Sequence, residues 1–372
     1  MIHLNHAGTS WPKPKEVLAA ATATLESPPG IAGDILGAGA RAVARLLDVS
    51  GEAGEARVSL TTGCTSALSL ALPLLPWARG DAVITSGLEH HALAGPIETL
   101  TRIAGIEWDA VAPGGGAAID LERVEARLRK GGVRLVAATF ASNVTGEILP
   151  IAELAHLAHE HGALFLLDAA QAAGNVPLRV PALGADLVVL AGHKGPLAPP
   201  GVGALWIAPH VEMRAPAATC ALPTSDAAPV CRPAPGFCDV GSANLPAVAG
   251  LTAGIEHLLG RGLDAVRAHG LARTERLLAG LARIEGVTVG GPPDAAARLA
   301  VVSVTLAGET PAAAERRLLE EHGVVARAGH HCAPLAHETL GTTAEGTLRF
   351  SFGPDSTDAD VDAVLVALDR HG

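Results

Sequence analysis

The sequence predicts an α/β protein with a mostly parallel sheet, followed by a smaller α+β unit. Apolar runs of strand length alternate with helical patterns from about residue 57 to residue 207. This alternation is typical of βαβ units and a parallel sheet. Beyond about residue 281 the order changes to strand, strand, helix, strand, strand, helix. The length of 372 residues also exceeds what one small core organises, which favours two domains.

Seven strands and the helices between them make up the first unit. We expect the strands at 58–60, 82–85, 106–111, 135–140, 163–167, 187–190 and 202–207. Helical patterns cover 65–74, 121–130 and 151–161, and Gly162 is a good stop for the last of them. The sequence therefore predicts a mostly parallel, seven-stranded sheet.

The second unit follows an interruption. Residues 209–238 are rich in Pro and Ala and predict an irregular excursion. A helical region then runs from 246 to about 281. The smaller unit has expected strands at 287–289, 300–306, 324–327 and 347–352, with helices at 311–322 and 358–369.

Composition limits the classes of function. The net charge of −11 argues against nucleic-acid or membrane-surface partners, and Pro, Gly or charge interrupts every apolar stretch before it reaches the length of a membrane span. The five cysteines are an odd number for a disulfide framework, and the first residues do not resemble a signal peptide. We therefore expect a reduced, cytoplasmic protein.

Three of the cysteines, Cys220, Cys231 and Cys238, lie close together in the sequence. Their separations do not match the tight Cys-x-x-Cys pairs of structural zinc. We expect unligated thiols and no metal site.

Lys194 is the first candidate for chemistry. Of four lysines, it alone follows a run that is typical of a buried strand, in the order Gly192, His193, Lys194. Removal from water at such a position lowers the pKa of a lysine toward that of a nucleophilic amine. Amines of this kind form Schiff bases with carbonyl cofactors such as pyridoxal phosphate. The alternative is an ordinary lysine in a loop at the end of a strand.

Asp168 strengthens the first interpretation. It ends the apolar run 163–167, and ligands gather at the carboxyl ends of parallel strands. Asp168 and Lys194 are thus expected to face one crevice. A pyridoxal-phosphate enzyme needs this pair, because a carboxylate keeps the pyridine nitrogen protonated. The alternative for Asp168 is a helix N-cap.

These residues and further motifs give the chain a recognisable resemblance. The motifs are Leu167-Asp168-Ala169-Ala170-Gln171, Gly192-His193-Lys194, Leu88-Glu89-His90-His91-Ala92, Ser142-Asn143-Val144-Thr145-Gly146 and Arg327-Ala328-Gly329-His330-His331-Cys332-Ala333-Pro334. In this order they resemble the class V aminotransferase family of fold-type I pyridoxal-phosphate enzymes, and within it the cysteine desulfurase and selenocysteine lyase branch. The resemblance implies a large domain over 16–250 and a small domain made of 1–15 and 251–372.

The resemblance also implies roles for individual residues. Lys194 would bind the cofactor covalently, Asp168 would contact the pyridine nitrogen, and His90 would stack on the ring. Asn143 and Gln171 would contact the substrate or the phenolic oxygen of the cofactor. The expected phosphate ligands are Gly63, Cys64, Thr65 and His193, with Ser242 reaching the phosphate of a neighbouring subunit in a homodimer with shared active sites.

Arg349 and Cys332 would act on the substrate. Arg349 matches the arginine that binds the substrate carboxylate, a pairing for which a guanidinium is well shaped. Cys332 matches the cysteine that attacks the sulfur of L-cysteine and becomes a persulfide, which is then passed to a thiol acceptor such as a sulfur-acceptor protein. Two histidines flank it, and cationic neighbours would lower the pKa of its thiol.

Departures from the family pattern keep other functions open. The family commonly has a phosphate-binding serine at Ala191, an acidic residue at Ser66 and a threonine at Cys64, and the 209–238 excursion lacks a glycine-rich run that many relatives carry. An aminotransferase, β-lyase or epimerase acting on another amino acid is therefore the alternative enzyme. A non-catalytic scaffold is the third hypothesis.

Overall fold

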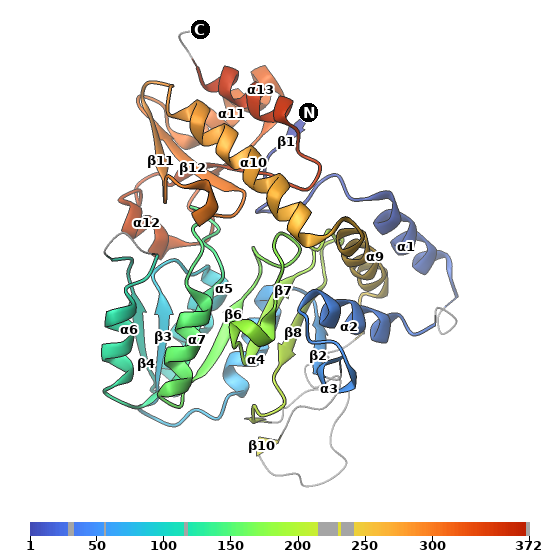
Figure 1. Cartoon of the computed structure of the whole chain (residues 1–372), viewed down its shortest axis with the longest axis vertical. Helices are drawn as coiled ribbons and strands as arrows, with labels where there is room; N and C mark the ends of the chain where they lie inside the picture. The colour runs from blue at the N-terminus through green and yellow to red at the C-terminus, as the bar shows by residue number, and fades with distance from the viewer. Residues whose placement is uncertain (29–32, 56, 115–117, 215–229, 232–241, 370–372) are drawn as a thin grey trace.

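A seven-stranded sheet organises the larger part of the molecule (Figure 1). The computed structural model describes residues 1–28, 33–55, 57–114, 118–214, 230–231 and 242–369. The strands of this sheet are β2 (Val58–Thr61), β3 (Ala82–Ser86), β4 (Glu107–Val111), β5 (Val133–Thr139), β6 (Leu164–Asp168), β7 (Leu187–Ala191) and β8 (Gly203–Ile207).

The strand order is β2-β8-β7-β6-β5-β3-β4. All pairings from β7 through to β4 are parallel, whereas β8 runs antiparallel to both β7 and β2. Every residue of β3, β7 and β8 is buried. A strand that is covered on both faces of the sheet needs apolar side chains on both sides, which explains the unbroken apolar runs in the sequence. The predicted mostly parallel, seven-stranded sheet is confirmed.

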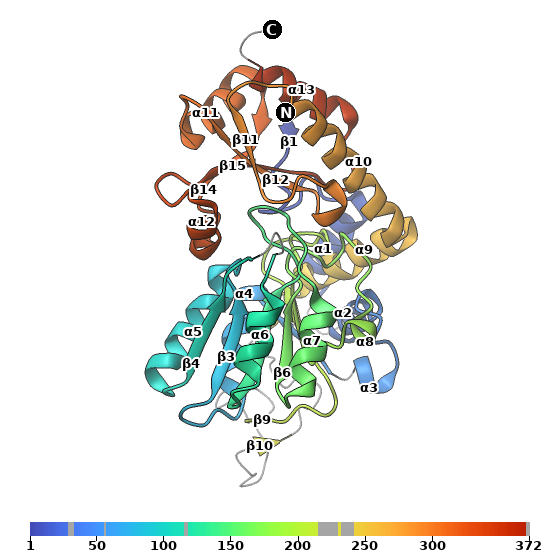
Figure 2. The ribbon, with the colours of Figure 1, turned by 60° about the vertical axis from the view of Figure 1, so that its left-hand side comes forward.

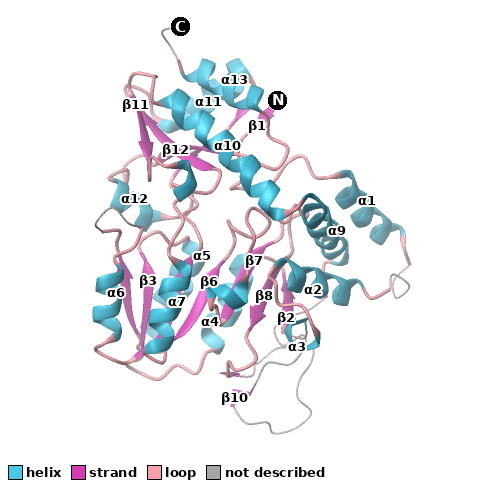
Figure 3. Ribbon diagram, viewed as in Figure 1, coloured by secondary structure: helices cyan, strands magenta, loops and turns pink. Residues whose placement is uncertain are grey.

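Helices cover both faces of the sheet (Figure 3). On one face α4 (Cys64–Leu74) packs on α5 (His91–Ile103) and against β7 and β8. On the other, α6 (Leu121–Leu128), α7 (Ile151–Glu160) and α8 (Val180–Leu183) form a second group, in which α7 contacts β5 and β6. The resulting core is built mainly of Ala, Leu and Val.

A helical group lies beside the β2 edge of the sheet (Figure 1). It contains α1 (Lys15–Glu26), α2 (Ile35–Leu46) and α9 (Leu245–Arg261), with α1 and α2 both packed on α9. The short α3 (Glu52–Glu55) follows α2, and α10 (Leu263–Leu281) follows α9. Gly262, with φ 81°, separates α9 from α10, so the predicted helical region 246–281 is two helices.

A four-stranded antiparallel sheet forms the second unit (Figure 2). Its order is β11-β12-β15-β14, and three helices accompany it. The elements are β11 (Val287–Gly290), β12 (Val301–Leu306), β14 (Arg327–Gly329), β15 (Thr347–Ser351), α11 (Pro311–His322), α12 (Pro334–Leu340) and α13 (Asp358–Leu368). Its separate core includes Leu4 from the N-terminus, beside Leu318 and Phe350.

The N-terminus joins this second unit. The strand β1 (Ile2–His3) pairs in parallel with β13 (Val324–Val325). The prediction of one strand over 324–327 was wrong, because β13 and β14 pair with different partners on either side of Ala326. Leu4 packs in the core of the second unit, whereas Leu251 and Ile255 of α9 pack in the core of the larger unit. The proposed domain boundaries at 15/16 and 250/251 stay a prediction.

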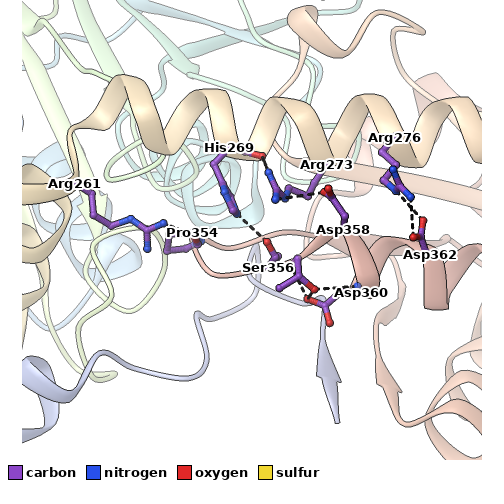
Figure 4. Close-up of polar contacts among 10 residues, drawn as sticks. Arg261, His269, Arg273, Arg276, Pro354, Ser356, Asp358, Asp360 and Asp362 are labelled. Carbon is purple, nitrogen blue, oxygen red and sulfur yellow. Dashed lines mark hydrogen bonds and ion pairs between the residues drawn. The ribbon is translucent and has the colours of Figure 1, made fainter.

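A row of polar contacts fixes the end of α9 and α10 to α13 and to the segment between β15 and α13 (Figure 4). Arg276 binds Asp362 through two hydrogen bonds of 2.7 Å, and the ring of His269 contacts the Ser356 carbonyl at 2.8 Å. Arg261 donates to the Pro354 carbonyl at 2.7 Å. Exposed pairs of this kind contribute little individually, but together they hold the chain that leaves β15.

Two sequence predictions fall largely outside the described residues. Of the 209–238 excursion, residues 209–214 and 230–231 are described, and β9 (Met213–Arg214) pairs there with β10 (Val230–Cys231). Cys220 and Cys238 lie outside the described residues, as does the side chain of Cys231. Within the described part of the chain, no helix combines the length and apolar character needed to cross a membrane.

Candidate active site

A pocket of about 1190 Å³ opens where the carboxyl ends of the large sheet meet the second unit. Its walls come from the N-terminal residues, from the loops after β2, β3, β5, β6 and β7, and from β14, the segment that follows it and β15. It gathers eleven of the residues singled out from the sequence, namely Gly63, Cys64, Thr65, His90, Asn143, Asp168, Gln171, His193, Lys194, Cys332 and Arg349.

Lys194 lies in the loop that joins β7 to β8. Removal from water lowers the pKa of its amine, while the nearby carboxylate of Asp168 opposes that shift. This is the direction that the apolar strand before it predicts. A lysine with a lowered pKa is more often a free amine at neutral pH and is therefore a better nucleophile and base.

Asp168 is the last residue of β6 and is 2% exposed. Its Oδ1 accepts hydrogen bonds from the Ala170 amide at 2.8 Å and from the Cys64 thiol at 3.5 Å. Burial and the adjacent carboxylate raise the pKa of Cys64 well above its usual range. Cys64 is therefore a neutral thiol at physiological pH and can donate its proton in the hydrogen bond to Asp168.

The amino terminus of α4 forms a cradle for an anion. Gly63 is its N-cap residue and offers no side-chain acceptor to the first amide groups of the helix. The helix approaches the sheet closely there, because a Cβ atom on Gly203 would lie 2.6 Å from the carbonyl carbon of Gly63. Uncapped helix amides and the helix dipole favour phosphate. Ala191, also in the pocket wall, provides no hydroxyl to this cradle.

Two polar side chains frame the middle of the pocket. His90 caps α5, and its Nδ1 accepts from the Ala92 amide at 3.0 Å. Burial, assisted by Lys194, lowers the pKa of His90, so its ring is a neutral plane. The side chain of Gln171 donates to the Ala7 carbonyl at 3.1 Å and thus contacts the N-terminal segment.

Arg349 is a buried cation on β15 and is 4% exposed. Its Nη1 donates to the Asn143 carbonyl at 2.9 Å and its Nη2 donates to Asn5 Oδ1 at 3.0 Å, while its Nε has no partner. Burial lowers the pKa of the guanidinium to about 10, so the charge remains at pH 7. Among the described residues no carboxylate forms an ion pair with Arg349, whose hydrogen bonds go to neutral oxygens. A buried guanidinium without a counter-ion favours an anionic ligand.

Cys332 lies in a tight loop after β14. Both His331 (φ 51°) and Cys332 (φ 57°) adopt the left-handed conformation, which costs a non-glycine residue about 1 kcal/mol. Two contacts from the larger unit hold this loop. Asn143 Nδ2 donates to the His331 carbonyl at 2.7 Å, and the His91 amide donates to the Cys332 carbonyl at 2.7 Å.

The expectation that histidines supply positive charge to Cys332 was wrong for His331. Burial and the neighbouring Arg349 lower the pKa of His331 to about 2, so this ring is neutral. Its Nε2 contacts the Thr347 carbonyl and hydroxyl at 3.2 and 3.1 Å. The positive charges that interact with Cys332 are those of Arg349 and Lys194.

Two further polar residues, Asn5 and Glu89, support the site, and one predicted residue, Ser242, lies outside the pocket. Asn5 contacts Arg349 from the N-terminal segment, where no local pattern marks it as part of a site. Glu89 is fully buried and accepts hydrogen bonds from the Thr139 amide at 3.1 and 2.9 Å. Ser242 is exposed, three residues before α9, and does not line this pocket.

The residues of the pocket fit pyridoxal phosphate. The uncapped start of α4 suits the phosphate, the buried carboxylate of Asp168 suits a protonated pyridine nitrogen, and Lys194 supplies the amine. Asn143 Oδ1 and His331 Nδ1 are buried polar atoms without partners in the same pocket wall. Unsatisfied buried atoms of this kind are expected where a polar ligand completes the site.

Comparisons with known proteins agree with this fit. The aminotransferase class-V family model matches residues 34–364. A probable cysteine desulfurase of Methanothermobacter thermautotrophicus is 30% identical over 315 residues, covering 83% of this chain and 78% of that protein. A probable cysteine desulfurase 2 of Mycobacterium leprae is 34% identical over 307 residues, covering 79% and 70%.

Two solved structures of cysteine desulfurases superpose on nearly the whole chain. The apo cysteine desulfurase of Thermococcus onnurineus superposes with a TM-score of 0.86 at 26% identity, covering 99% of this chain and 94% of that one. The S-sulfonic acid form of the Escherichia coli cysteine desulfurase CsdA superposes with a TM-score of 0.87 at 25% identity, with the same coverage.

Proposed function

The chain belongs to the class V aminotransferase family of pyridoxal-phosphate enzymes, and from this premise we propose that it is a cysteine desulfurase. It would convert L-cysteine to L-alanine and carry the sulfur as a persulfide on Cys332. The observation that carries the proposal is the meeting, in one pocket, of Lys194, Asp168 and Arg349 with an exposed thiol at Cys332.

Each of these residues has a separate task. Arg349 would bind the substrate carboxylate with the Nε proton that has no partner in the protein. Lys194 Nζ would remove the proton from the substrate Cα, since its lowered pKa suits a general base. Pyridoxal phosphate, when bound, supplies the electron sink that stabilises negative charge at that carbon. Asp168 would keep the ring nitrogen protonated, and His90 would stack on the ring.

Cys332 would complete the reaction. Its thiolate sulfur forms a bond with the substrate sulfur as the bond from that sulfur to Cβ breaks. The proton from the Cys332 thiol balances the new C–H bond of alanine, so the products are L-alanine and a persulfide. The exposure of Cys332 supports later transfer of this sulfur to a thiol acceptor, for which we propose a partner protein.

We also propose a homodimer with shared sites in the cytoplasm. In this arrangement Ser242 would serve the cofactor phosphate of the partner subunit. Its exposed position, outside the pocket of its own chain, supports this role. Cys64 and Cys332 are free thiols, which suits a reducing compartment.

The test is incubation with L-cysteine while sulfide and alanine are measured together. Mass spectrometry without reductant should find the persulfide on Cys332. Cys332→Ala should still bind pyridoxal phosphate and change its absorbance with L-cysteine, yet release little or no sulfide, because only sulfur removal needs this thiol.

Cys64→Ser is the matched control, because it removes the other thiol of the pocket and keeps a donor toward Asp168. It should retain persulfide on Cys332. If Cys332→Ala desulfurates as fast as the wild type, or if the wild type ignores cysteine and transaminates another amino acid, the desulfurase assignment is wrong.

A further inference from the structure

One backbone carbonyl next to Lys194 accepts an unusual number of hydrogen bonds. The His193 oxygen is within 3.0 Å of the Ser10 amide, 3.0 Å of the Ser10 hydroxyl, 3.2 Å of the Thr9 hydroxyl and 3.0 Å of Lys13 Nζ. All the donors come from one short N-terminal segment, residues 9–13. A carbonyl oxygen has two lone pairs, and a strand partner would supply it with one donor. Here the N-terminal segment surrounds the His193 oxygen with several donors.

Lys13 is the charged member of this group. It is partly buried, and loss of water lowers the pKa of its amine to about 8. Among the described residues no carboxylate pairs with it, and its Nζ donates instead to the Ser10 hydroxyl at 2.6 Å and to the His193 carbonyl. Placing an ammonium away from water and without a counter-ion costs free energy. The fold therefore retains Lys13 at a cost in stability that a surface lysine would avoid.

The position of the carbonyl decides what Lys13 can affect. The His193 oxygen belongs to the planar peptide group that ends at the Lys194 nitrogen, so fixing this oxygen fixes the start of Lys194. On its other side the Lys194 carbonyl accepts from the Leu197 amide within the loop. Before His193, Gly192 is held by hydrogen bonds with Val202 and Ala198. The hydrogen bonds to the His193 carbonyl itself come from the N-terminal segment.

We propose that Lys13 is a positioning residue for Lys194: with Thr9 and Ser10 it holds the His193 carbonyl, and so sets the Lys194 backbone at the floor of the pocket. The proposal rests on the proposed function only in taking Lys194 as the lysine that binds the cofactor. Reacting groups need placement to well within 1 Å, so loss of this support should slow the reactions of the Lys194 amine.

The experiment follows capture of pyridoxal phosphate by apoprotein, with no amino acid present. Absorbance gives the rate and affinity, and borohydride trapping with mass spectrometry counts the cofactor on Lys194. Lys13→Met should weaken capture about ten- to hundredfold, the effect expected for one hydrogen bond from a charged donor. Lys13→Arg should restore most of the loss, because it returns a cationic donor. Ser10→Ala, which keeps the amide donor, should have a smaller effect in the same direction.

Lys15→Met is the matched control, because Lys15 is an exposed lysine two residues further along. It should behave as the wild type. In turnover of L-cysteine, Lys13→Met should lower kcat and leave KM nearly unchanged, since Arg349 is not altered.

Several results would overturn the proposal. Lys13→Met could capture pyridoxal phosphate as well as the wild type, or Lys15→Met could lose as much affinity as Lys13→Met. Lys13→Arg could fail to improve on Lys13→Met. Loss of cooperative thermal unfolding in both Lys13→Met and Ser10→Ala would show a role in folding alone. If the wild type itself traps no cofactor on Lys194, the proposed function is wrong, and this inference, which depends on it, is wrong as well.

Discussion

The buried carboxyl group of Glu89 should make the stability of the protein depend on pH in a direction opposite to that of most acidic residues. Glu89 lies between the ends of β3 and β5, where it contacts the Ser86 hydroxyl and accepts from the Thr139 amide. Burial raises its pKa from 4.5 to about 8, although these hydrogen bonds oppose the shift. The folded protein therefore holds a proton on Glu89 at neutral pH.

The sign of the effect follows from proton binding. Between about pH 4.5 and pH 8 the folded state binds a proton at Glu89 that the unfolded chain has lost. The contribution of this group is fully present below pH 4.5 and is lost as the pH rises toward 8. The free energy of unfolding should therefore fall by at most about 1.4 kcal/mol for each pH unit within this range. Glu89→Gln has the same shape and does not titrate, so it should lack this slope.

The assay is urea unfolding of the apoprotein, wild type and Glu89→Gln, at pH 5.5 and pH 7.5. Histidines and other acids titrate in both proteins and cancel in the comparison. Over these two pH units the wild type should lose up to roughly 2.7 kcal/mol more than the variant. Parallel loss in the two proteins would refute a protonated Glu89.

Three further predictions concern the pocket. Asp168→Ala should lose far more activity than affinity for pyridoxal phosphate, because the cradle at α4 remains, and comparison of kcat with the cofactor dissociation constant checks this. Gly174→Ala should lower kcat at least about tenfold, because Gly174 has φ 81° and a Cβ atom there would lie 2.5 Å from the carbonyl carbon of Gly195, directly after Lys194. Mixing inactive Lys194→Ala with a disabling Ser242 variant should recover activity if the sites are shared, and confirmed subunit exchange without recovery would contradict that arrangement.

The large sheet could be predicted because its strands carry a strong local signal. Parallel strands covered on both faces must be apolar throughout, and β6 and β7 are such runs, each ending next to a residue of the site. The same argument brought Asp168 and Lys194 to one pocket, since the carboxyl ends of neighbouring parallel strands share an edge. For these two residues, the place in the site can be predicted from the strand that each one follows or ends.

The rest of the site depends on contacts that leave no local pattern. Asn5 and Arg349 meet across 344 residues of sequence, and their hydrogen bond depends on how the N-terminal segment crosses the second unit. The charge of His331 was mispredicted for a related reason, because burial by the folded chain makes it neutral. The division of 324–327 into two strands likewise depends on the choice of pairing partner, which is a property of the assembled fold.

The residues proposed to bind the cofactor lie in the larger unit, and those proposed to act on the substrate carboxylate and sulfur lie in the second unit. Asn143 connects the two units. Arg349 and Cys332 come from the second unit, and both are tied to this one residue of the larger unit: Arg349 through the Asn143 carbonyl at 2.9 Å and the Cys332 loop through Asn143 Nδ2 at 2.7 Å. In L-cysteine the carboxylate and the sulfur are only a few bonds apart, so an enzyme that holds one and attacks the other must fix the distance between its own two groups. Because a single residue contacts both, one group through its backbone carbonyl and the other through its side chain, a shift of Asn143 moves the carboxylate anchor and the nucleophile together. This arrangement preserves the spacing on which attack at the sulfur of a small amino acid depends.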